Sequence, residues 1–178
     1  MHDGAMTTTW TAPAVERAEG PLTGDERAML QGFLDWHRAT LLYKCAGLTA
    51  AQLAERAAPP STLSLLGLIR HLTKVERTWF RRRVAGEAVA PLFQADGRRD
   101  VDFDDLDPEA AAADYGRFVE ECKLADAAVA GASLDDIFVL DGEPHSLRLV
   151  YLHLIQEYAR HNGHADLLRQ RIDGVTGA

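Results

Sequence analysis

The sequence contains no apolar run long enough to cross a lipid bilayer, which argues against an integral membrane protein. It also lacks an excess of positive charge, because 19 lysines and arginines stand against 27 aspartates and glutamates, for a formal net charge of −8. This acidic balance argues against nucleic acid or an anionic membrane surface as a main partner. We therefore expect a protein that binds neither nucleic acid nor membrane.

Cysteine is scarce as well. Cys45 and Cys122 are too few for a disulfide framework, and both fall on apolar helix stripes as small hydrophobic residues. The N-terminus does not show the charged-then-apolar order of a signal peptide. Together these features predict a reducing, cytoplasmic setting. Internal repeats and low-complexity tracts are absent, and 178 residues with 47% hydrophobic content suit one domain with a sizeable core.

Four long segments have the period of amphipathic helices, whereas strand signals are few. Before them, residues 1–21 are small, polar and aperiodic, which predicts a flexible N-terminal leader ahead of a helical domain over residues 22–178. Capping residues and terminal glycines set the expected boundaries, beginning with a capping-box pattern at Thr23 and Glu26. The four helices are expected over residues 23–45, 61–85 (or from 64), 108–130 and 146–174.

The connections between these helices carry weaker signals. Thr49 begins a second capping-box pattern and predicts a short helix, and Asp141-Gly142 after an apolar run predicts a small turn between extended pieces. Residues 87–107 form an acidic loop without clear periodicity, and the loop lacks the ligand order of an EF-hand. We therefore predict an all-α fold: a four-helix bundle with short extra helices in its connections.

The fourth segment places ionisable residues on its buried face. Steps of three and four residues along a helix follow one face. A charged or ionisable group on such a face is costly unless it is paired or bound to a metal. We therefore expect a site in the middle of this helix. Its stripe reads Leu147, Val150, Leu154, Glu157, His161, His164 and Leu168.

Glu157 and His161 lie one helical turn apart, so their side chains can hold the same ion. Carboxylate and neutral imidazole suit a divalent first-row metal, zinc first, with nickel or iron as alternatives. A third ligand from another helix would leave an open coordination position, as in catalytic zinc sites. His71 is the candidate, because it lies at the edge of the apolar face of the second helix.

Other readings of the histidines stay open. A Glu-x-x-x-His pair is common on solvated helix faces, although the flanking Leu154 and Leu168 favour a buried position here. His164 is a fourth ligand, a partner of a ligand or a substrate contact. His153 and His37 are expected to be buried, hydrogen-bonding histidines.

Two stretches resemble the DinB/YfiT-like metalloenzyme superfamily, in a largely actinobacterial subgroup: residues 65–80 around His71, and residues 146–166 with Glu157, His161 and His164. The resemblance spans about residues 23–174. It implies an up-down-down-up four-helix bundle with His71, Glu157 and His161 as metal ligands. This set is similar to that of the metal-binding domain of mycothiol-dependent maleylpyruvate isomerase. Many relatives read His-Arg-Gly-Gln where this chain has His161-Asn-Gly-His164, which leaves the role of His164 open.

The resemblance also implies a low-molecular-weight thiol, and an Arg-rich, Lys-poor composition typical of GC-rich genomes favours mycothiol. The leading hypothesis is a metal-dependent transferase or isomerase that activates this thiol for reaction with a small electrophile, with His164 as the catalytic residue. A metal-dependent hydrolase is one alternative. A non-catalytic, metal-stabilised stress or binding protein is another. The sequence gives no distinct interface for self-association, so a homodimer stays open.

Overall fold

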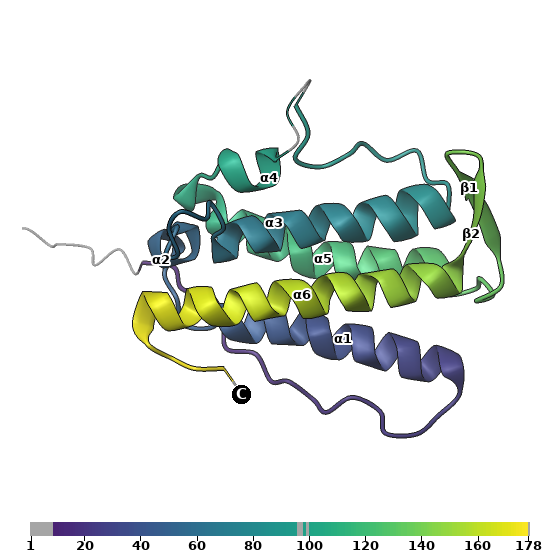
Figure 1. Cartoon of the computed structure of the whole chain (residues 1–178), viewed down its shortest axis with the longest axis horizontal. Helices are drawn as coiled ribbons and strands as arrows, with labels where there is room; N and C mark the ends of the chain where they lie inside the picture. The colour runs from purple at the N-terminus through teal and green to yellow at the C-terminus, as the bar shows by residue number, and fades with distance from the viewer. Residues whose placement is uncertain (1–8, 96–97, 99, 178) are drawn as a thin grey trace, which may run out of the picture.

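The computed structural model describes residues 9–95, 98 and 100–177. Its fold is all-α, as predicted, with four long helices lying side by side and one small hairpin at the end of the assembly (Figure 1). The α1 helix packs on α6, and α3 packs on both α5 and α6. The long helices are α1 (Glu26–Cys45), α3 (Leu65–Glu76), α5 (Ala111–Val129) and α6 (Leu147–Asp173).

Capping residues explain where these helices begin and end. The predicted start at Thr23 is wrong, because the Asp25 carboxylate accepts a hydrogen bond from the Ala28 amide at 2.9 Å and α1 begins at Glu26. Ser64 caps α3, and Ser146 caps α6. The expected end of α6 is confirmed at Gly174, whose φ of 81° is readily adopted only by glycine.

The second predicted helix does not stay α-helical over its whole length. The α3 helix passes into a π-helical segment, Arg77–Val84 (η1), before the chain turns at Gly86. Arg77 and Arg81 of this segment both pair with the buried carboxylate of Glu121 in α5, at 2.5 and 3.0 Å. These ion pairs fasten the wider turns of η1 to α5.

Short elements occupy the connections. The predicted capping box of Thr49 and Gln52 is confirmed and begins α2 (Ala50–Ala54). The predicted turn at Asp141-Gly142 joins β1 (Ile137–Leu140) to β2 (Glu143–Ser146) in an antiparallel pair. The acidic loop contains a helix that the sequence did not predict, α4 (Val101–Asp104), which lies against α3 (Figure 1). A 3₁₀ turn, Pro108–Ala110 (η2), leads into α5.

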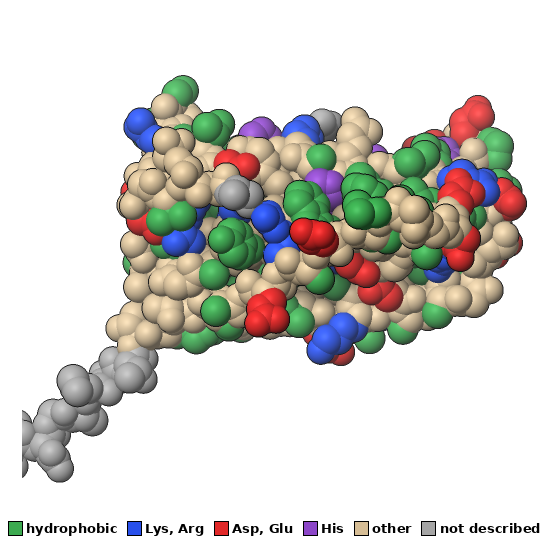
Figure 2. Space-filling view, turned by 90° about the horizontal axis from the view of Figure 1, so that it is seen from below, with side chains coloured by type: hydrophobic (Ala, Val, Ile, Leu, Met, Phe, Trp, Pro, Cys, Tyr) green, Lys and Arg blue, Asp and Glu red, His purple; other side chains and the backbone are tan. Residues whose placement is uncertain are grey.

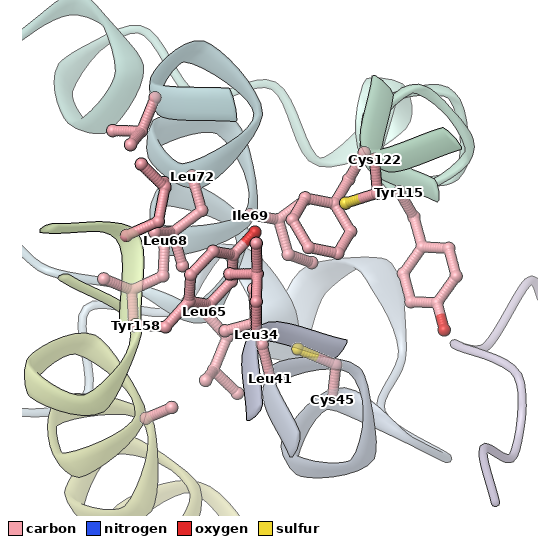
Figure 3. Close-up of a cluster of buried hydrophobic side chains, with 14 of the residues drawn as sticks. Leu34, Leu41, Cys45, Leu65, Leu68, Ile69, Leu72, Tyr115, Cys122 and Tyr158 are labelled. Carbon is pink, nitrogen blue, oxygen red and sulfur yellow. The ribbon is translucent and has the colours of Figure 1, made fainter. Parts of the chain in front are cut away.

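The core lies between the four long helices, and leucine is its most frequent residue; Tyr158 and both cysteines are buried with the leucines (Figure 3). Cys45 and Cys122 are free and buried, as their stripe positions predicted. Burial raises the pKa of Cys45 to about 12 and raises that of Cys122 as well. Neither cysteine is therefore ionised at neutral pH, and neither is suited to act as a nucleophile.

One ion pair is buried inside this apolar core. Arg38 of α1 donates two hydrogen bonds of 2.7 Å each to Glu76 at the end of α3, and Glu76 is fully buried. The Tyr158 hydroxyl of α6 donates to the same carboxylate at 2.8 Å. The Glu76 carboxylate therefore links α1, α3 and α6.

Part of the predicted leader runs alongside α1 (Figure 1). Ala12 is buried, and its backbone exchanges hydrogen bonds with Leu48 and Gly47 at 2.9 and 2.8 Å. Trp10 packs edge-on against Tyr115 of α5, with ring centroids 6.0 Å apart. Residues 1–8 of the leader lie outside the described residues.

The surface carries mixed charge. On the face shown in Figure 2, acidic and basic side chains are interspersed with hydrophobic ones, and neither sign forms one continuous patch. In the part of the chain that the structure describes, no helix is both long and apolar enough to cross a membrane.

Candidate metal centre

Two helices bring the three predicted ligands together. His71 projects from α3, and Glu157 and His161 project from successive turns of α6, which packs against α3. One nitrogen or oxygen from each of the three side chains lies within 4.8 Å of the other two. The predicted ligands on the stripe of α6 and the one at the edge of the apolar face of α3 therefore meet at one point.

The spacing between these atoms suits an ion better than direct hydrogen bonds. Nε2 of His71 lies 3.6 Å and Nε2 of His161 lies 3.9 Å from Oε1 of Glu157. Both distances exceed a hydrogen bond. Two ligands that each lie about 2.1 Å from a tetrahedral zinc ion are roughly 3.4 Å apart, which is close to these separations.

Both imidazole nitrogens that face Glu157 also lack partners. Nε2 of His71 and Nε2 of His161 are buried and accept no hydrogen bond from any described residue. A buried nitrogen without a partner costs about 1–3 kcal/mol. A divalent cation bound by both nitrogens would remove that cost, so the donor set fits a metal.

The ionisation states also suit a metal. Burial, reinforced by the neighbouring His71, lowers the pKa of His161 to about 3, so its imidazole is neutral at neutral pH. Burial opposes the charge of Glu157, but the hydrogen bond from Arg160 and the nearby imidazoles lower its pKa below the ordinary value. A neutral imidazole and an ionised carboxylate are the forms that bind metals.

The three residues of the cluster differ in their exposure to solvent. The side chains of His71 and Glu157 are 18% and 17% exposed, whereas His161 is 4% exposed. Solvent therefore reaches the cluster along His71 and Glu157 and hardly at all along His161.

His164 lies next to the cluster and outside the group of three. Its Nδ1 is 3.4 Å from Nδ1 of His161, on the opposite side of the His161 ring from Glu157. Of the three roles left open for His164, this contact favours a partner of a ligand.

His153 and His37 were predicted to be buried, but both are half-buried, and both lie outside the cluster. His153 contacts Trp79 with the two rings tilted and their centroids 4.5 Å apart, and burial lowers the pKa of His153. His37 is contacted by the side chain of Asn162 at 3.3 Å from Nδ1, and burial lowers its pKa as well. Burial thus keeps both rings neutral at neutral pH.

Sequence reasoning missed Asp102 of α4. Its Oδ2 lies 2.8 Å from Nδ1 of His71 and 2.6 Å from Nζ of Lys74, and the residue is fully buried. Burial opposes its charge, but His71 and Lys74 hold its pKa below the ordinary value. Asp102 belongs to an acidic stretch of many aspartates, and nothing in the spacing distinguishes it from its neighbours.

Long packed helices with a His-Glu-His cluster between two of them define an all-α protein with a candidate metal centre. The model of the mycothiol-S-transferase family matches residues 29–174, and the chain belongs to this family. Membership confirms the DinB/YfiT-like resemblance and supports thiol transfer at the level of the family. No curated protein and no solved structure matches the chain.

Proposed function

We propose that this protein is a metal-dependent transferase that joins mycothiol to a small electrophile. The observation that carries the proposal is the convergence of His71, Glu157 and His161, with two unpartnered imidazole nitrogens, in a chain of the mycothiol-S-transferase family. We interpret the four long helices as a DinB-type four-helix bundle formed by residues 22–178. The two free cysteines and a reduced thiol cofactor fit a cytoplasmic setting.

In this proposal His71, Glu157 and His161 are the metal ligands. A divalent cation held by them, zinc in the first place, would supply the positive charge that lowers the pKa of a nearby sulfhydryl. In the transfer, the mycothiol sulfur forms a bond to the electrophilic carbon and the bond from that carbon to its leaving group breaks. The leaving group departs with the bonding pair, and the sulfhydryl proton passes through a protein base to the leaving group or to solvent.

We assign the proton-handling role to His164. If Nδ1 of His161 carries its hydrogen, it donates to Nδ1 of His164 and leaves Nε2 of His161 free for the metal. A neutral imidazole has a single lone pair, so His164 can take up the sulfhydryl proton only when this contact with His161 opens. We therefore assign His164 two alternating roles: it orients His161 while the contact is closed, and it accepts a proton when the contact is open.

Replacing His164 with glutamine separates these two roles. The glutamine amide can still meet Nδ1 of His161 but cannot take up a proton, so zinc affinity should change little. Mycothiol transfer should fall by about 10²- to 10⁴-fold, the usual contribution of a proton-transferring side chain. Zinc affinity is measured by chelator competition, and transfer by loss of free mycothiol with an alkylating electrophile. Full activity of H164Q would remove His164 from the mechanism.

The proposed function is tested with protein purified without a histidine tag. The metal content is measured first, and mycothiol consumption is then compared for metal-loaded and chelator-stripped protein. We expect consumption only with metal, restored when zinc is added back. Turnover of an ester or amide without thiol would favour the hydrolase, and a metal-loaded protein without any turnover would favour a structural role.

A further inference from the structure

The α4 helix is attached to α3 around the first metal ligand. The Phe103 ring stacks on the His71 imidazole, with centroids 5.1 Å apart. Phe103 also fills the space left by Gly67, since a Cβ at that position would lie 2.8 Å from the Phe103 ring. Arg70 donates to the backbone oxygens of Val101 and Asp105, at 3.1 and 2.6 Å. Consecutive turns of α3 therefore hold α4 in place.

The centre of this attachment is Asp102, a buried carboxylate that contacts both Lys74 and His71. Asp102 accepts from Lys74 and faces His71 through the same oxygen, Oδ2, at 2.6 and 2.8 Å. An ionised carboxylate can only accept hydrogen bonds, so Nδ1 of His71 must carry the hydrogen in this contact. The lone pair of His71 is then on Nε2, the unpartnered nitrogen that faces Glu157.

We propose that Asp102, supported by Lys74, is a positioning residue that holds His71 in the tautomer and orientation required for metal binding, and that docking of α4 is thereby coupled to the metal. The inference rests on the proposed function only in taking His71 as a ligand. Carboxylate partners of metal-bound histidines typically contribute about 10- to 100-fold in metal affinity. Because such coupling is reciprocal, bound metal must in turn stabilise docked α4.

The first test measures zinc affinity by chelator competition. Asp102→Ala should bind zinc about 10- to 100-fold more weakly than the wild type. Asp102→Asn should lose less, because its amide oxygen still accepts from Nδ1 of His71. Asp104→Asn is the matched control: it removes one negative charge from the same short helix at an exposed position and should bind zinc like the wild type.

Gly67→Ala tests the docking without touching an ionisable residue. Its new methyl group must displace Phe103, while alanine is a better helix former than glycine and keeps α3 intact. Zinc affinity should therefore fall in this variant as well. Circular dichroism checks that the variants retain native helix content.

Hydrogen exchange tests the reverse effect, the effect of bound zinc on the stability of α4. The amides of Phe103, Asp104 and Asp105 form the hydrogen bonds of α4. Zinc should slow their exchange in the wild type and in D104N, and should leave it unchanged in D102A. A folded D102A with wild-type zinc affinity would overturn this inference and leave the proposed function standing. A wild type that binds no zinc would overturn both.

Discussion

Replacing His161 with alanine is expected to abolish tight metal binding. His161 is the most buried of the three candidate ligands, and its Nε2 has no partner among the described residues. Loss of a residue that only supports a ligand costs about 10- to 100-fold in metal affinity, so loss of a ligand should cost more than about 100-fold. Zinc affinity of untagged protein is measured by chelator competition, with elemental analysis of the protein as purified.

His153→Ala is the matched control for this prediction. It removes an imidazole from the same helix, outside the cluster of three, where the ring contacts Trp79. H153A should keep wild-type zinc affinity, and mycothiol consumption should be lost in H161A alone. Equal zinc affinity of H161A and the wild type would remove the metal centre and, with it, the proposed function.

The sequence predicted the candidate site residues that lie on regular helices, because helix periodicity shows which side chains face the core. Glu157 and His161 lie on one stripe of α6 between buried leucines, and His71 lies at the edge of the apolar face of α3. Periodicity tells which face of a helix is buried, so it places these residues inside. That α3 and α6 meet at these turns is a tertiary fact, which the family resemblance implied and the structure supplies.

The sequence did not predict the roles of residues that lie in irregular segments or whose partners are distant in the sequence. Asp102 reaches His71 from a loop without periodicity, so no local pattern marks it among the neighbouring aspartates. Arg38 was missed for another reason. The sequence predicted burial for His37 and not for its neighbour Arg38. In the structure Arg38 is 6% exposed, because Glu76 of α3 is a partner that offsets the cost of burying its charge. Glu76 is 38 residues away from Arg38 in the sequence, so no local pattern predicts this pair.

That buried pair gives the largest expected effect on stability. Although burial opposes the charge of Arg38, Glu76 holds the pKa of the guanidinium above its ordinary value. Replacing Glu76 with leucine removes the carboxylate that Arg38 and Tyr158 both contact, and leaves Nε and Nη2 of the buried guanidinium without their acceptor. Breaking such a pair from one side typically lowers the free energy of unfolding by about 3–5 kcal/mol. Urea denaturation of the metal-free protein measures this loss.

The double variant Arg38→Met with Glu76→Leu separates the cost of an unpaired charge from the value of the pair. Replacing both partners with apolar residues of similar size is often neutral or stabilising. Here recovery should be incomplete, because the Tyr158 hydroxyl still loses its acceptor, at a cost of about 1–3 kcal/mol. The double variant should therefore be more stable than E76L and less stable than the wild type.

An E76L protein within about 1 kcal/mol of the wild type would show that Arg38 finds enough compensation in Asp126 and Asp35, which it also contacts. Since Tyr158 follows Glu157 directly in α6, the same hydrogen bond also fixes the position of α6 against α3 beside the candidate metal ligands.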